Sequence, residues 1–160
     1  MAIMTTDVLA FADQWYTAIM KEHVGEQKQS EFFIIPSKAY IVLCDGSVLL
    51  LDQHDDIHGK FSEEHYTLDK PYVTELSCNP DRVRVKLTLY WQAQFKEGLD
   101  QSGWINAAVG VDWILARDND HCLKFVSYRN SYLQVLPESG VDQGGLGDVY
   151  GGGHFSANAS

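Results

Sequence analysis

Two histidines four residues apart are the residues in this sequence best suited to chemistry. His54 and His58 are separated by one helical turn, which places both side chains on one face of a helix. The apolar residues Ile57 and Phe61 share that face, so we expect it to look inward. An imidazole with an unperturbed pKa of about 6.5 can take up or release a proton near neutral pH. The spacing therefore predicts two proton-transferring groups beside an apolar cavity.

The histidine pair could also have a purely structural role or bind a metal. One or both rings could be core residues bonded to backbone carbonyls, or could lie at a rim in water. With Asp55 after the first histidine, the stretch also imitates a zinc-protease motif. Zinc needs a third protein ligand, the usual base is glutamate, and the sequence offers no second ligand motif. We expect neither a metal nor another cofactor, because no glycine-rich phosphate loop joins a strand to a helix.

Helical and turn signals place the histidines in the first half of the chain. Spaced apolar residues predict a long helix from about Thr6 to His23, with a polar loop over Glu26–Glu31. The Asp45-Gly46 turn between two apolar runs predicts a β-hairpin. A second, shorter helix then follows, from about Asp52 to Glu64.

The remainder of the core has the pattern of β-structure. From Val83 to Phe95, apolar and polar residues alternate without a break, with Trp91 on the apolar face. A strand over Trp104–Ala116 puts Trp113 on its apolar face, and a strand over Tyr72–Ser77 precedes them. The two indoles are expected to wall the cavity, where they would stack on flat ligands, although ordinary core packing would account for them equally well.

The final strand and the tail are defined less sharply. Over Leu123–Leu136, one face carries Val126, Tyr128, Asn130 and Tyr132, and Tyr128 and Asn130 could hydrogen-bond a ligand if that face looks inward. Beyond Pro137 the chain has no periodicity and holds seven of its 13 glycines. We expect residues 138–160 to form a glycine-rich tail that is mobile or orders on a partner.

The order of these elements resembles the nuclear transport factor 2-like superfamily, including its SnoaL-like branch. The resemblance covers about Thr6 to Pro137 and depends on the strand patterns Val83–Trp91 and Val109–Leu115. It implies one domain over residues 1–137, an α+β fold of the cystatin-like cone type. In such a cone a long N-terminal helix packs in a curved antiparallel sheet. The resemblance also implies an apolar pocket inside the cone and a homodimer formed through the sheet.

The resemblance suggests roles for two further residues. Tyr16 lies on the first helix where some enzymes of the superfamily place a tyrosine that polarises a carbonyl, although core filling is the common role of such a residue. Asp112 resembles, by its place in a late strand, the buried acid of the isomerases. The strand alternation instead places Asp112 on the outer face, within reach of Arg84, Lys86 or Arg129. Whether Asp112 faces the pocket stays open at this point.

Composition narrows the range of partners. Asp and Glu number 22 against 12 Lys and Arg, a formal net charge of -10, which disfavours nucleic acids and anionic membranes. The three cysteines lie far apart and suit a reducing compartment. Neither a signal peptide nor a stretch long enough to span a membrane is apparent, so a cytoplasmic protein is expected.

Two functions agree with these observations. In the first, the chain is an isomerase, dehydratase or cyclase that acts on an apolar, carbonyl-bearing small molecule. His54 or His58 would move the proton, Tyr16 would donate to the carbonyl, and the remaining contacts would come from Trp91, Trp113, Phe61, Tyr128 and Asn130. In the second, the chain is a non-catalytic module for ligand binding or dimerisation. A cavity of several hundred cubic ångströms with convergent polar groups favours the enzyme, and a plugged cone favours the module.

Overall fold

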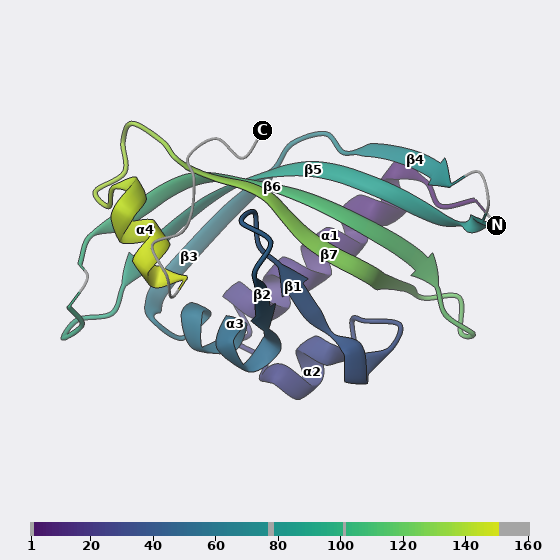
Figure 1. Cartoon of the computed structure of the whole chain (residues 1–160), viewed down its shortest axis with the longest axis horizontal. Coiled ribbons are helices and arrows are strands. Elements are labelled where there is room, and N and C mark those ends of the chain that lie inside the picture. The colour runs from purple at the N-terminus through teal and green to yellow at the C-terminus, as the bar shows by residue number, and fades with distance from the viewer. Residues whose placement is uncertain (1, 77–78, 101, 151–160) are drawn as a thin grey trace.

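The computed structural model describes residues 2–76, 79–100 and 102–150. A long helix, α1 (Thr5–Met20), lies in the hollow of a strongly curved sheet (Figure 1). One face of α1 is buried along its whole length, including Val8, Phe11 and Trp15. The predicted helix at this place is confirmed, and it ends three residues earlier than expected.

Seven strands form one sheet, in the order β2-β1-β7-β6-β5-β3, with β4 also paired to β5. Their bounds are β1 (Tyr40–Val42), β2 (Val48–Leu50), β3 (Phe61–Leu68), β4 (Tyr72–Leu76), β5 (Asn79–Phe95), β6 (Trp104–Arg117) and β7 (Leu123–Val135). All pairings are antiparallel except that of β1 with β7. The predicted α+β fold, with a long helix packed in a curved sheet, is confirmed. The sheet is mixed and not antiparallel throughout, because β1 pairs in parallel with β7.

The alternation predicted for β5 and β6 is confirmed. Every apolar residue of β5 from Val83 to Phe95 that was expected to point inward is at most 5% exposed. The inward-facing apolar residues of β6 from Ile105 to Leu115, including Trp113, are buried in the same core. Together these two strands supply the inner wall against which α1 packs.

The region around the histidines differs from the prediction. The supposed loop contains a short helix, α2 (Glu26–Ser30), and the second helix, α3 (Leu51–His58), ends six residues before Glu64. Gly59 follows α3, and the chain from Phe61 pairs with the edge of β5 as strand β3. Tertiary pairing along that edge overrides the local helical pattern.

Two irregularities in the pairing of β6 with β7 decide which side chains of β7 point inward. The register shifts between Gly110 and Val111 and again between Ile114 and Leu115. A β-bulge moves the residues that follow it to the opposite face. Asn130 is consequently buried, whereas Tyr132 turns to the outer face, where its hydroxyl lies 2.6 Å from the Thr88 hydroxyl. The predicted common face of Asn130 and Tyr132 was wrong for this reason.

The segment after β7 is partly helical. Gln143–Val149 form α4, whose Asp142 side chain accepts a hydrogen bond from the Gly145 N–H at the helix start. The Gln143 side chain holds α4 to the end of β7, because its Oε1 accepts from the Val135 N–H and its Nε2 donates to the Leu133 carbonyl. The expectation of an aperiodic tail is therefore wrong for these seven residues. Residues 151–160 lie outside the described part of the chain.

Within the described residues, no helix combines the length and apolar character needed to cross a membrane.

Candidate active site

His54 and His58 face into the core from α3. Both histidines are only 5% exposed, and the Nε2 atoms of the two rings lie 3.1 Å apart. The rings meet edge to face, with centroids 4.6 Å apart. The predicted inward orientation of this helix face is confirmed.

Glu64 extends the histidine pair into a chain of buried polar groups. The Nδ1 atom of His58 lies 2.7 Å from Glu64 Oε1, and the Trp91 indole N–H donates to the same oxygen at 3.0 Å. Glu64 is only 1% exposed. A carboxylate hydrogen-bonded to one imidazole nitrogen fixes the orientation of the ring.

Sequence reasoning missed Glu64 because it assigned this residue to a helix. In strict strand alternation, Glu63 would share the inner face with Phe61. A register shift between Phe61 and Glu63 turns Glu64 inward instead. No feature of the sequence in this stretch shows where such a shift falls.

Gln29 of α2 holds the other end of the chain. Its Nε2 donates to the Val24 carbonyl at 3.0 Å and to Asp55 Oδ1 at 3.1 Å. The opposite amide orientation would set Oε1 against two acceptors, so the amide orientation is determined. Gln29 Oε1 therefore accepts from His54 Nδ1, which lies 2.9 Å away. Gln29 is 1% exposed, although its surrounding sequence is polar.

These bonds determine where the protons of the histidine pair are. Burial, and secondarily the neighbouring His58, lower the pKa of His54 well below its usual value, so His54 is neutral. With its hydrogen on Nδ1, His54 offers only a lone pair at Nε2, and His58 must therefore donate its Nε2–H. The hydrogen bonds leave one proton unassigned, which can be bonded either to His58 Nδ1 or to Glu64 Oε1. His58 is thus a proton donor at Nε2 whichever of the two holds it.

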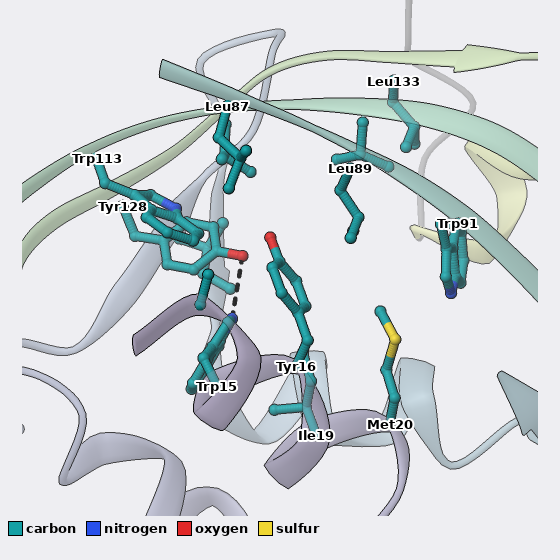
Figure 2. Packing of buried hydrophobic residues seen from close by; sticks show 14 of the residues in the cluster. Trp15, Tyr16, Ile19, Met20, Leu87, Leu89, Trp91, Trp113, Tyr128 and Leu133 are labelled. Atoms are coloured by element: carbon teal, nitrogen blue, oxygen red, sulfur yellow. Dashed lines mark hydrogen bonds between the residues drawn. The ribbon is translucent and has the colours of Figure 1, made fainter. Parts of the chain in front are cut away.

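A small cavity of about 20 Å³ lies beside this chain, with room for about one water molecule. Figure 2 shows Tyr16 rising from α1 between Tyr128 and Trp91. The cavity is lined by Tyr16, Ile19, Met20, His54, His58, Leu89, Trp91, Val109, Tyr128, Asn130 and Tyr150. All three side chains expected to be catalytic, and three of the five expected to bind ligand, therefore meet at one place.

Unpaired polar atoms converge on the same region. Among the described residues, the Tyr16 hydroxyl, Asn130 Oδ1 and Glu64 Oε2 are buried without a hydrogen-bond partner. Burial, and then the nearby Tyr128, raise the pKa of Tyr16 well above its ordinary value. A buried polar group without a partner costs about 1–3 kcal/mol. Tyr16 and Asn130 both line the cavity, so a molecule held there could supply the partners that these two groups lack.

Aromatic contacts hold the site in place. The Trp15 indole N–H donates to the Tyr128 hydroxyl at 3.3 Å (Figure 2). The Trp15 ring also lies parallel to that of His54, with centroids 5.8 Å apart. Trp15 therefore fixes one residue of the sheet and one of α3 from the central helix.

Two residues expected to touch a ligand lie outside the cavity lining. Phe61 packs edge to face against Trp91, with ring centroids 5.3 Å apart, and Trp113 packs against Phe125 at 5.0 Å. Both are fully buried core side chains. In this structure both side chains therefore lie outside the cavity lining, and their contact with a ligand stays a prediction.

Asp112 lies on the outer face of the sheet, as the alternation indicated. Arg84 donates to its two carboxylate oxygens from Nε at 2.9 Å and from Nη2 at 2.6 Å. These hydrogen bonds lower the pKa of the Asp112 carboxyl from its usual value. Asp112 therefore has no part in the cavity. Within the described part of the chain, no cluster of three His, Cys, Asp or Glu residues is arranged to hold a metal.

Solved structures with the same architecture come from several bacteria. A candidate dehydratase of the NTF2-like family from Streptomyces avermitilis superposes with a TM-score of 0.58 at 17% identity, covering 78% of this chain and 95% of that one. A cystatin-like protein of unknown function from Nostoc punctiforme has a TM-score of 0.56 at 13% identity, covering 88% and 98%. A protein from Catenulispora acidiphila, solved in complex with S-DNPA, has a TM-score of 0.57 at 10% identity, covering 78% and 91%.

The chain has the nuclear transport factor 2-like fold. No protein-family model matches the sequence, and no curated protein sequence matches it either. At these identities the structural likeness establishes the fold alone, and function has to be argued from the site.

Proposed function

We propose that this protein binds a small apolar molecule carrying a carbonyl or hydroxyl group and rearranges it by proton transfer, as an isomerase, dehydratase or cyclase does. The proposal depends on one observation. His58 is held between a neutral His54 and a buried Glu64, beside a cavity onto which unpaired Tyr16 and Asn130 atoms converge.

The hydrogen-bond directions suggest the order of events. His58 carries a proton on Nε2, so its first act would be to donate that proton to a substrate oxygen that replaces His54 as acceptor. The Tyr16 hydroxyl would donate a second hydrogen bond to the same oxygen. Nε2 is then left with a lone pair and can remove a proton from the neighbouring carbon. In an isomerisation the oxygen stays on the substrate, and in a dehydration it leaves as water. The enzyme regains its proton in both cases.

A substrate needs more room than the cavity offers in this structure. Tyr150, directly after α4, contributes to the cavity lining, and the Lys60 ammonium contacts the Val149 carbonyl at 3.5 Å. We propose that α4 and Tyr150 move aside when a substrate enters. The alternative is a non-catalytic module with a closed core. The cavity volume of about 20 Å³ is the observation that favours this alternative.

The test compares two histidine substitutions. His58→Gln should abolish deuterium incorporation at the α-carbon of an apolar ketone such as 2-tetralone, monitored by NMR in heavy water. Removal of a general acid–base typically lowers a rate by about 10²–10⁴-fold. His65→Gln is the matched control, because His65 is half exposed and pairs only with surface groups.

Each result has a definite meaning. If the wild-type protein exchanges above the buffer rate and His58→Gln does not, while circular dichroism shows both folded, the proposal holds. Equal exchange in the two proteins would remove His58 from the mechanism. No exchange with any apolar ketone, together with an empty cavity in mass spectra of the purified protein, would favour the module.

A further inference from the structure

A second, larger hollow lies at the edge of the sheet, apart from the histidines. Two bridges join the early part of the chain to β7, one between Phe33 and Phe125 and the other between Val42 and Arg129. Between Phe33 and Val42 the early segment turns away from β7 and forms a short 3-10 helix, η1 (Pro36–Lys38). The gap is a groove of about 490 Å³. Volumes of roughly 300–1,000 Å³ are typical of small-molecule sites.

The groove has an apolar interior that the described chain leaves open. Phe33 and Phe125 are buried at its base, whereas Ile35 and Tyr40 on its wall are 50% and 45% exposed. Exposed large apolar side chains next to a concave surface are typical of binding sites. A ligand with an apolar body would remove this area from water.

The charges around the groove are all positive. Three basic residues line it, Lys38, Arg82 and Arg129, and no acidic residue of the described part of the chain does. The full sequence has 22 acidic and 12 basic residues. A surface region with the average composition of the chain would contain more carboxylates than cations. The groove is therefore a local reversal of the charge of the protein.

None of the three cations has a hydrogen-bonded or closely ion-paired partner within the described chain, although the charge of Arg129 acts on Asp112 from a greater distance. Their side chains form no hydrogen bond there and no ion pair within 4 Å. The Asp112 carboxylate, on the residue paired with Arg129 across the sheet, is already engaged by Arg84. Like charges gathered at one concave site raise the local concentration of anions. Arginine in particular presents a planar group that matches a carboxylate.

We propose that this groove binds an amphipathic organic carboxylate, with the apolar body on Phe33, Ile35 and Tyr40 and the carboxylate among Lys38, Arg82 and Arg129. These six residues lie outside the lining of the proton-transfer site, although Tyr128 borders both hollows. A membrane or nucleic-acid partner is disfavoured, because the chain as a whole carries a formal net charge of -10.

The test uses 2-naphthoate and its neutral counterpart 2-naphthalenemethanol, each titrated into the protein and followed by chemical-shift changes. We expect the naphthoate to bind more tightly than the alcohol and to shift groove signals. Lys38→Glu and Arg129→Glu should each weaken naphthoate binding by at least about fivefold, because an attraction at a partly exposed site becomes a repulsion. Lys96→Glu is the matched control, since Lys96 is exposed and lies outside the groove lining.

High salt gives a second measurement that needs no variant. It should weaken naphthoate binding to the wild-type protein and leave binding of the alcohol nearly unchanged. Equal affinity for the two probes, or equal loss in Lys96→Glu, would overturn the proposal. Chemical-shift changes centred on Tyr16 and Tyr150 would also overturn the proposal, because they would place the ligand in the inner cavity. Loss of probe binding as the protein dimerises would show that the groove is an interface between two copies.

Discussion

At the scale of single residues, the direction of hydrogen bonds matters more than the identity of the histidines. Two neutral imidazoles can each donate or accept at Nε2, and the distance between them does not say which does. The Gln29 amide settles the question, because both of its N–H groups are already engaged. His58 is consequently the donor and the partner of Glu64, so the two histidines have different roles despite their similar burial.

The burial of His54 leads to a prediction about pH. Its pKa is lowered in the folded state, so His54 binds a proton more readily when the chain is unfolded. The unfolded state therefore gains stability as the pH falls below about 6.5, and the free energy of unfolding falls with it. The contribution of the neutral His54 to the free energy of unfolding is fully present above that pH. Its slope is at most about 1.4 kcal/mol per pH unit, since one proton is involved.

Urea unfolding of the wild type and of His54→Gln between neutral and mildly acid pH measures this contribution. Glutamine can still donate to Gln29 and accept from His58, but it does not titrate. We expect the difference in stability between the two proteins to narrow or reverse as the pH falls. A constant difference over that range would show that His54 is protonated in the folded protein.

At the scale of elements, small departures from regular structure place the functional groups. The register shift in β3 turns Glu64 towards His58, and the shifts between β6 and β7 turn Asn130 inward and Tyr132 outward. Tyr132 then covers Gly110, where the space for a Cβ atom is occupied by the tyrosine ring. α4 closes the end of the cone and brings Tyr150 to the cavity.

The closing role of Tyr150 is open to test. Tyr150→Ala should enlarge the cavity towards the order of 150 Å³, a volume that accepts a benzene-sized ligand. We expect cyclohexanone to bind this variant more tightly than the wild type, with shifts at the His58 ring, as followed by NMR. The free energy of unfolding should fall by about 0.5–3 kcal/mol.

Tyr72→Ala is the control for this substitution, because Tyr72 is 75% exposed on β4. It should change neither cyclohexanone binding nor stability by a measurable amount. If Tyr150→Ala bound the ketone no better than Tyr72→Ala, the C-terminal segment would not be what limits access to the histidines.

At the scale of the whole molecule, the curved sheet has a buried inner face and an outer face with a mixed surface. Tyr90 is 42% exposed there, near the Arg84–Asp112 pair and the contact between Thr88 and Tyr132. We propose that two chains form a homodimer through this face. Amphipathic side chains on a broad sheet can bury the area that a stable interface needs.

Light scattering at micromolar concentration should report twice the monomer mass of 18.0 kDa. Tyr90→Glu should shift the distribution towards monomer, because it would bury two charges symmetrically in the interface. Glu63→Lys, at an exposed position on β3, is a control for an altered charge. A monomeric wild-type protein would remove the dimer from consideration.

Much of the architecture could be predicted because it depends on repeating patterns. The apolar alternation of β5 and β6 determines their inner faces over many residues, and the helical spacing of His54 and His58 determines that they share a face. Trp91 could therefore be selected as a cavity residue from the alternation. Tyr16 was selected from the resemblance, and Tyr128 and Asn130 only on the condition that their face looks inward. The prediction was weakest where an element is short, as at α2 and α4.

The sequence by itself thus determined which faces of β5 and β6 are apolar, where the histidine pair points and the order of the longest elements. Only the tertiary structure decided that Glu64 and Gln29 complete the histidine chain, that Trp113 and Phe61 stand behind the cavity, and that Tyr150 closes it. The physical reason is that one extra residue in a strand reverses the faces of all that follow. The residues whose contacts stabilise such a shift lie far away in the sequence.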